Sequence, residues 1–481
     1  MIITYSSSHS KSTSTQPRPS YGAAIPSTEY RQIDMGRSPT SAEAPLLGPP
    51  PYQLQEKPRK SFTCLRFFKA FLIALGLYLA ISYIMHRTNT HIIIGDEFEL
   101  LNPLPADGDI MDCFPPNASS SIFDVQDQDQ PMLDNDYDFK EYFSYSIPSS
   151  SKLIYFLSRG NLGYGSLQFV LADDAGDNVK VDVVARYSRR SILDKSRICH
   201  LTRNNNNEQG IGFFTPQTRG SISSRDMVHF TVTIQFPRNQ NSVQEPLLIQ
   251  GLDTKMGIWG HSLFLDNLVR FNQINLHGSN SPIVIKNVLL ENADISTTNS
   301  PITGSFTIER KTTLKTSNAR IDVDVTMINR DGTQPTIAKL STSNGAVTAP
   351  ITLVSKGTNS DQPSAFDVSA KTSNAPLTLS FPDAPIDPFS ILNLFGSTSN
   401  APVKTTLHPT YEGNILLQTS VFGPSLEQSY ASDPSGQGRD RIIYTQRTRG
   451  KLSSDVKWGE NSTANGHVSL KTSNSPNTLY L

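Results

Sequence analysis

The sequence predicts an all-β protein: a β-solenoid outer domain with Thr-Ser-Asn corner repeats, plus one transmembrane helix and a disordered N-terminal tail. Three observations support this prediction. A Thr-Ser-Asn tripeptide recurs through the second half of the chain. The segments around it alternate apolar and polar residues, which is the period of a half-buried strand. One long apolar run lies at residues 67–85, and no other segment has the spacing of an amphipathic helix.

Residues 1–66 form a tail that we expect to be disordered and cytosolic. Ser, Pro, Thr, Gln and Gly dominate it, so it cannot bury enough apolar surface to offset the entropy of ordering. It contains a PPxY pattern that fits a WW-domain groove, which would make a WW-domain protein its partner. It also contains a YRQI sequence of the endocytic sorting type; the alternative is an inert spacer. The residues of the two motifs are Pro49, Pro50, Pro51, Tyr52, Tyr30 and Ile33.

The apolar run at residues 67–85 is long enough to cross a membrane. Nineteen residues at a rise of about 1.5 Å each give about 28 Å, close to the hydrocarbon thickness of about 30 Å. Lys and Arg cluster before the run, whereas the twenty residues after it contain only Arg87, which predicts a cytosolic N-terminus and residues 86–481 outside the cell or in a lumen. The alternative is a buried helix of a soluble domain. A cleaved signal peptide is disfavoured because the run starts too far from the N-terminus.

The three cysteines and two glycosylation sequons fit this topology. Cys64 lies just before the span, where palmitoylation and an unmodified thiol are the two alternatives. Cys113 and Cys199 lie on the oxidising side, where they either pair or stay free. The sequons at Asn117 and Asn461 lie on the same side and are candidate glycosylation sites.

We expect residues 86–140 to be a stalk, because they carry turn residues and acidic residues with little alternation. Residues 141–270 then contain a set of alternating segments that predict strands. The segment DDAGDN at 173–178 lies between two of these strands. It is predicted to be a hairpin turn, because the spacing of a calcium-binding EF-hand loop is absent.

Residues 271–481 form the repeat region, and its unit is a corner followed by a strand. Asn is predicted to turn the chain in a left-handed conformation, and the following Pro opens a strand. In that strand Leu377, Leu379 and Phe381 face one side. The last interval contains a polar insertion around 425–440 and a degenerate corner at 419–424. The marker residues are Asn280, Asn299, Asn318, Asn344, Asn374, Asn400 and Asn474.

Apart from the last interval, these asparagines are 19 to 30 residues apart, which is a spacing typical of solenoids. If the units stack, the asparagines align and their amides hydrogen-bond along the stack. A large antiparallel sandwich is the alternative, because a strict coil would have regular spacing.

The corner units, the single span and the Pro/Ser-rich tail together resemble fungal single-pass membrane proteins. The outer domain, over residues 140–481, is similar to the bacterial putative-adhesin β-solenoid family. The resemblance implies a fold and a surface role, and it supplies no catalytic residues to transfer.

No catalytic, cofactor-binding or metal-binding motif occurs in the sequence. HExxH, paired CxxC, GxSxG, P-loop and dinucleotide fingerprints are all absent. The net charge of −1 argues against a nucleic-acid partner. Residues 251–268 hold Asp253, His261 and Asp266, and we interpret this segment as a junction between strand sets rather than as a site.

The favoured function is therefore a non-enzymatic surface protein whose polar face binds a cell-wall glycan or another surface ligand. One alternative is a polysaccharide-acting enzyme, for which Asp322 and Asp324 share a strand face. The other is a membrane adaptor that recruits a WW-domain ubiquitin ligase through its tail.

Overall fold

The computed structural model describes Leu72, 75–78, Ala80, 102–114, 137–173, 176–218, 220–238, 245–330, 334–356, 364–382, 390–460 and 465–481. The chain divides into two compact units, Met1–Ile92 and Ile93–Leu481. In the first unit the described residues are helical and exposed, and most of the predicted span at 67–85 lies outside them. Of the residues that were described, none belongs to a helix both long and apolar enough to cross a membrane.

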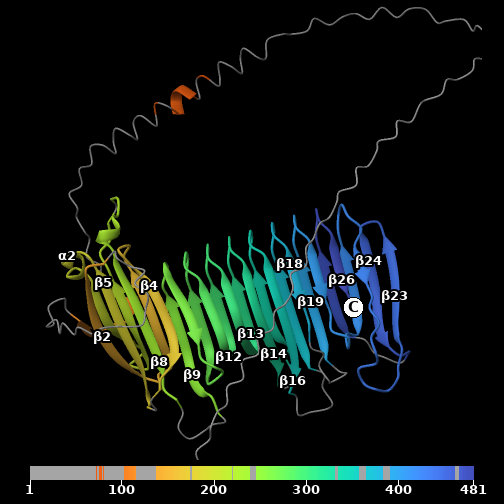
Figure 1. The fold of residues 1–481 in the computed structure, drawn as a ribbon, viewed down its shortest axis with the longest axis horizontal. Helices are drawn as coiled ribbons and strands as arrows, with labels where there is room; N and C mark the ends of the chain where they lie inside the picture. The colour runs from red at the N-terminus through yellow and green to blue at the C-terminus, as the bar shows by residue number, and fades with distance from the viewer. Residues whose placement is uncertain are drawn as a thin grey trace, which may run out of the picture. The chain divides into compact units, whose positions relative to one another are not determined.

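The described residues of the second unit form mainly β-structure, which confirms the predicted class (Figure 1). Its first strands are β1 (Asp109–Phe114), β2 (Phe139–Pro148), β3 (Leu153–Arg159), β4 (Gly163–Leu171), β5 (Asn178–Tyr187), β6 (Arg197–Arg203), β7 (Glu208–Phe214), β8 (Val228–Phe236) and β9 (Leu247–Lys255). Short helical turns lie among them at η1 (Pro105–Asp107), α2 (Arg190–Leu193) and η2 (Ser224–Asp226).

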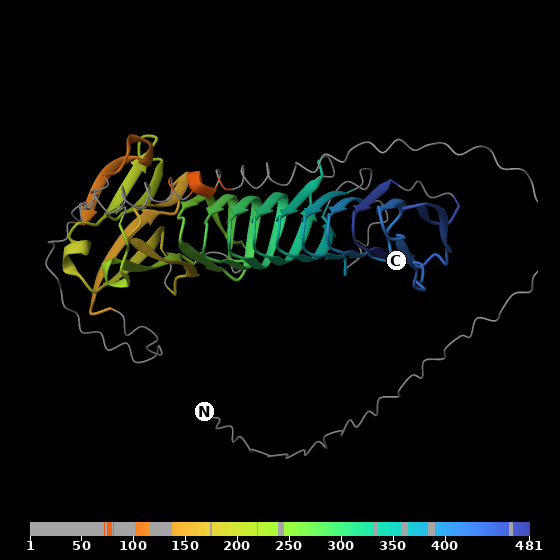
Figure 2. The same ribbon diagram turned by 90° about the horizontal axis from the view of Figure 1, so that it is seen from above.

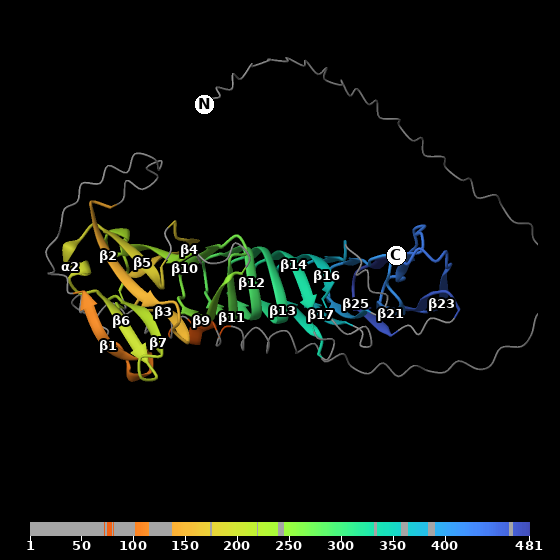
Figure 3. The same cartoon turned by 90° about the horizontal axis from the view of Figure 1, so that it is seen from below.

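The repeat region builds two rows of parallel strands, one on each side of the Thr-Ser-Asn corners. The pre-corner row contains β11 (Val269–His277), the ends of β12 (Ile283–Ser296) and β13 (Ile302–Lys315), β15 (Thr336–Ser341), β17 (Ala365–Lys371), β19 (Ile391–Ser397), β25 (Gly466–Lys471) and β21 (Gly413–Gln418). The post-corner row contains β10 (Trp259–Phe264), the starts of β12 and β13, β14 (Ile321–Asn329), β16 (Val347–Ser355), β18 (Leu377–Ser380), β20 (Val403–Thr406), β26 (Asn477–Tyr480) and β22 (Ser425–Glu427). Figures 2 and 3 show the successive strands of the repeat side by side.

Each strand contributes apolar side chains to the space between the rows. Leu377, Leu379 and Phe381 are all buried, as their alternation predicts, whereas Thr378 and Ser380 are only half-buried. The pairing in both rows is parallel, whereas an antiparallel sandwich requires antiparallel neighbours.

The unequal repeat lengths have one structural cause. In the two 19-residue units, β12 and β13 run from one row into the other without a break in the strand. In the longer units the extra residues all lie between a post-corner strand and the next pre-corner strand, at 330–335, 356–364 and 381–390. The strands beside the corners therefore stay in register although the number of residues between them varies, so irregular spacing does not disturb the stack.

Three expectations need correction in the first part of the unit. The segment at 173–178 does not close a hairpin, because β8 lies between β4 and β5 and pairs with both. The predicted stalk is not separate throughout, since β1 pairs with β6. The boundary at residue 270 is also not a structural break, because β11 pairs with β9 on one side and β12 on the other.

The C-terminal strands enter the stack out of chain order. Strand β25 lies between β19 and β21, and β26 lies between β20 and β22. After β20 the chain leaves room for one further layer and forms β21 and β22. It continues through the antiparallel strands β23 (Arg441–Thr448) and β24 (Lys451–Trp458), and then fills that layer with β25 and β26. The last interval, 74 residues long, therefore contains several strands that lead away from this part of the stack and back to it, and it is not a single polar insertion. The 419–424 segment lies on the corner stack, where the Ser420 amide donates to the Ser473 carbonyl at 3.2 Å.

Candidate functional site

The corner residues divide their roles between the inside and the outside of the stack. The threonine of every Thr-Ser-Asn unit is buried. Its hydroxyl donates to a carbonyl of the preceding corner, as in Thr372 to Gly345 at 3.0 Å and Thr398 to Ser373 at 3.3 Å. The threonine therefore joins adjacent units instead of only closing its own turn.

The asparagines form a continuous ladder on the surface, which confirms the predicted stacking. Each Nδ2 donates to the Oδ1 of the asparagine one corner earlier, over distances of 2.6–2.8 Å, from Asn299 to Asn474. None of the described corner asparagines has a positive φ, so the left-handed turn expected of them is wrong. Asparagine is used here for its amide, which both donates and accepts along the stack.

The segment at 251–268 does not bring its three candidate residues together. His261 is fully buried on β10, and its Nε2 lies 2.9 Å from the Thr254 hydroxyl. Burial lowers the pKa of His261 to about 4, so the ring is neutral at physiological pH. Asp253 faces outward toward Lys255, and Asp266 occupies a tight turn with φ +48°. The segment forms part of a continuous row of strands, since β10 pairs with β4 on one side and β12 on the other, so the predicted junction between two separate strand sets is wrong.

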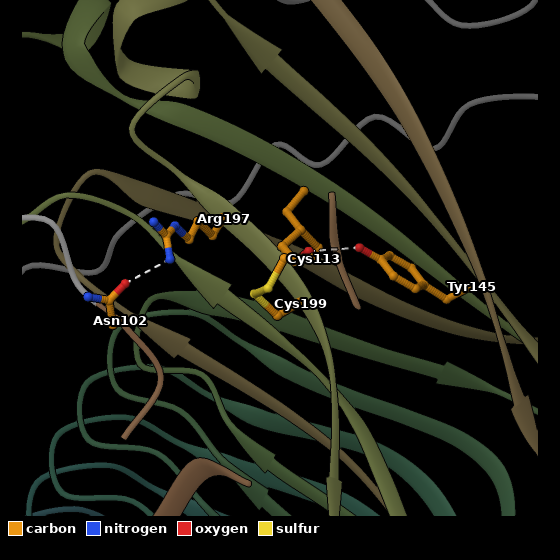
Figure 4. The surroundings of a disulfide bond; sticks show 6 residues. Asn102, Cys113, Tyr145, Arg197 and Cys199 are labelled. Atoms are coloured by element: carbon orange, nitrogen blue, oxygen red, sulfur yellow. Dashed lines mark hydrogen bonds between the residues drawn. A yellow bond between two sulfur atoms is a disulfide. The ribbon is translucent and has the colours of Figure 1, made fainter. Parts of the chain in front are cut away.

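Cys113 and Cys199 form a disulfide that fastens β1 to β6 (Figure 4). They are direct register partners in the antiparallel pair, and Cys199 is fully buried. The neighbouring Tyr145 hydroxyl donates to the Ile198 carbonyl at 2.9 Å, and Arg197 donates to Asn102 at 2.8 Å. The bond therefore holds the first described strand of the second unit on the sheet.

Several predicted sites lie outside the described residues. They are Tyr30, Ile33, Pro49, Pro50, Pro51, Tyr52, Cys64, Asn117 and Asn461.

The acidic pair proposed for an enzyme is not part of a carboxylate cluster. Asp322 and Asp324 are exposed on β14, and their neighbours on β13 are Thr303 and Ser305. Within the described part of the chain, no group of three or more His, Cys, Asp or Glu is placed to hold a metal ion.

A charged hollow of about 340 Å³ lies where the two rows meet near the start of the repeat. Arg270 contacts Glu309 at 2.6 Å and Glu291 at 3.7 Å, and Arg310 contacts Glu291 at 3.5 Å. Arg330 also pairs with Glu309. Because these ion pairs join successive strands, we interpret this hollow as a link between units.

A wider hollow of about 520 Å³ lies on the outer face of the pre-corner row, over β15, β17, β19 and β25. Phe395 is 39% exposed within it, and the Lys371 Nζ lies 5.0 Å from the centre of the ring. Asn393 donates to Asp367 at 2.9 Å, and exposed His467 is the register partner of Asn393 on β25. An exposed ring surrounded by amide, imidazole and hydroxyl groups is suited to a ligand with both apolar and polar faces.

This face could not be predicted from local sequence, because its members come from four strands of the row. Its signal was present in single residues: Phe395 stands where the pattern of a half-exposed strand predicts a polar residue. Only the stacking order brings His467 beside Asn393, 74 residues away in the chain.

Comparison with known proteins adds one weak structural similarity. No protein-family model and no curated protein matches the sequence. A solved structure that matches is a "putative cell adhesion protein" from Clostridium sporogenes ATCC 15579, at 9% identity and a TM-score of 0.17. The match covers 71% of this chain and 99% of the other. A similarity this low assigns neither a family nor a function.

Proposed function

We propose that the second unit is a β-solenoid and that the protein is a non-enzymatic, single-pass membrane protein. In this proposal the solenoid serves adhesion by binding a glycan of the cell wall or of a cell surface. The solenoid assignment is supported by parallel, in-register pairing through both rows and by aligned corners with an asparagine ladder.

The observation that carries the binding proposal is the hollow around Phe395. Aromatic rings pack against the apolar faces of sugars, while nearby amides and hydroxyls bond to sugar hydroxyl groups. The Asn393 amide, the Asp367 carboxylate and the His467 imidazole line the same hollow as the ring and can form hydrogen bonds with those hydroxyl groups. The rigid parallel rows hold these groups in place before a ligand arrives, which limits the entropy lost on binding.

Retention on a glycan array tests this proposal directly. The purified full-length protein, in detergent, is compared with Phe395→Ala. The matched control is Phe264→Ala on β10, because Phe264 is 41% exposed and lies 5.5 Å from the Lys286 Nζ. We expect Phe395→Ala to weaken glycan binding at least tenfold and Phe264→Ala to leave it unchanged. Equal effects of the two substitutions, or no retained glycan, would contradict the proposal.

The membrane part of the proposal rests on residues 67–85 and their basic N-terminal flank. Carbonate extraction and endoglycosidase treatment of expressing cells test it. We expect the protein to resist extraction and to shift in mass on deglycosylation, with the shift lost in an Asn117→Gln/Asn461→Gln variant. Release by carbonate would refute the anchor, and an unglycosylated wild-type chain would count against the proposed orientation.

A further inference from the structure

From β13 to β25, one register position of the pre-corner row carries lysine on every second strand; beyond them it holds Ser296 on β12, His277 on β11 and Gln418 on β21. The residue directly before the corner is Lys315 on β13, Ser341 on β15, Lys371 on β17, Ser397 on β19 and Lys471 on β25. The corner sequences accordingly alternate between Lys-Thr-Ser-Asn and Ser-Thr-Ser-Asn along the stack. Neighbouring strands lie about 4.8 Å apart, so the lysines repeat at about 10 Å.

These three lysines are available for an external ligand. Lys315, Lys371 and Lys471 are exposed, and in the described chain no carboxylate forms a salt bridge with any of them. The intervening Ser341 and Ser397 are half-buried and place hydroxyl groups between the ammonium groups. The position therefore forms a straight line of alternating positive charge and hydroxyl.

The post-corner row has no such line. On β13, β14, β16, β18, β20 and β26 the second residue of the strand also faces outward, and it is Thr303, Asp322, Thr348, Thr378, Lys404 and Thr478 in turn. Its charges do not repeat, so the lysine alternation is a property of one face and not of the fold.

Phe395 lies on the strand between two of the lysines, two residues before Ser397, which is their register partner. Strand β19, which carries Phe395, is flanked by β17 with Lys371 and by β25 with Lys471. The ring already holds the Lys371 ammonium group at 5.0 Å. An anionic group that bridges Lys371 and Lys471 would therefore bring its own ring or chain onto Phe395.

We propose that this face binds a linear anionic polysaccharide that runs along the stack and across the strands. Its carboxylate or sulfate groups pair with Lys315, Lys371 and Lys471, and one sugar ring packs on Phe395. The inference rests on the proposed glycan-binding function and specifies the class of glycan. Each ion pair is weak because it is exposed, and affinity comes from several pairs engaged at once on one chain.

The geometry favours a polysaccharide over a single-stranded nucleic acid. Nucleic-acid channels combine positive charge with several stacking rings along the strand. Across β13, β15, β17, β19 and β25, Phe395 is the one outward-facing aromatic residue that the described face presents. The serines on the line and the Asn393 amide on the same face suit hydroxyl-rich sugars.

The test uses the full-length protein in detergent with four probes: polygalacturonate, dextran sulfate, the neutral glucan laminarin, and a single-stranded DNA oligonucleotide. The variant is the triple substitution Lys315→Ala, Lys371→Ala and Lys471→Ala. The matched control replaces the same lysines with Arg, which keeps the charge. We expect binding to polygalacturonate or dextran sulfate that weakens with salt, falls at least tenfold in the Ala variant and persists in the Arg variant. Which of the two is bound more tightly distinguishes a carboxylate ligand from a sulfate ligand.

Binding to laminarin that the triple Ala variant leaves unchanged would overturn this inference while the proposed glycan-binding function stands. Binding to neither acidic glycan would overturn this inference, whereas the proposed glycan-binding function is decided separately by the glycan array. Lysine-dependent binding to DNA without binding to either acidic glycan would also overturn it. Circular dichroism of the Ala variant, expected to match the wild type, shows that any loss is not due to misfolding.

Discussion

Replacing Asn374 with Ala tests whether the asparagine ladder stabilises the stack. The Asn374 amide donates to Asn344 at 2.7 Å and accepts from Asn400 at 2.8 Å, so the substitution removes two ladder bonds. An intramolecular hydrogen bond contributes about 0.5–1.5 kcal/mol net, and these bonds are exposed, so we expect a loss of about 1–2 kcal/mol in the free energy of unfolding. Asn280 takes part in one ladder bond, and its replacement should cost about half as much.

A double-mutant cycle in urea unfolding separates the ladder from general effects of Asn→Ala substitution. Asn344 and Asn374 share one bond, so the double variant loses three bonds instead of four and should be less destabilised than the sum of the singles by about 0.5–1 kcal/mol. Asn280 and Asn374 share none, so their effects should add. Additive effects in both pairs, or a loss below about 0.3 kcal/mol for Asn374→Ala, would refute the reasoning.

Three further predictions concern the ends and the core. Cys113→Ala should lower the free energy of unfolding by about 2–4 kcal/mol without affecting glycan binding, as urea unfolding and the array would show. Deleting residues 466–481 leaves β19 and β21 without the strand that separates them, so limited proteolysis should cut the chain after β20 while the earlier units stay resistant. His261 has a folded-state pKa of about 4 against an ordinary value of 6.5. The unfolded chain therefore binds an extra proton between these pH values, and stability falls as pH is lowered through that window. His261→Gln should reduce this pH slope by about 1.4 kcal/mol per pH unit. Unchanged stability, unchanged proteolysis or an unchanged pH slope, respectively, would contradict the three predictions.

Local pattern was sufficient to predict the strands and the corners. The alternation of Leu377, Leu379 and Phe381 identifies the buried face, and the constant corner sequence identifies what must align. The amide ladder followed from that alignment. The role of asparagine in the corner was predicted only in part: the residues were expected to turn the chain in a left-handed conformation, but their φ angles are not positive.

Non-local pairing could not be predicted in the same way. Nothing in residues 466–481 indicates that they lie between β19 and β21, because a strand pattern specifies which face is buried and not which strand is the neighbour. The same limit hid the position of β8 between β4 and β5. The lysine alternation was legible in the sequence, yet its even spacing exists only because β25 follows β19 in the stack.

The order of the last strands is the claim on which the binding face depends, and cysteine cross-linking measures it most directly. In a Cys64→Ser background, Ser397→Cys is combined either with Lys471→Cys, its register partner on the adjacent strand, or with Gln418→Cys, one strand further away. When a mild oxidant is added, we predict a disulfide between residues 397 and 471, whose strands lie about 4.8 Å apart. We predict none between residues 397 and 418, which are about twice that distance apart. Cross-linking of 397 with 418 and not with 471 would place the strands in chain order and would remove Lys471 from its place beside Phe395.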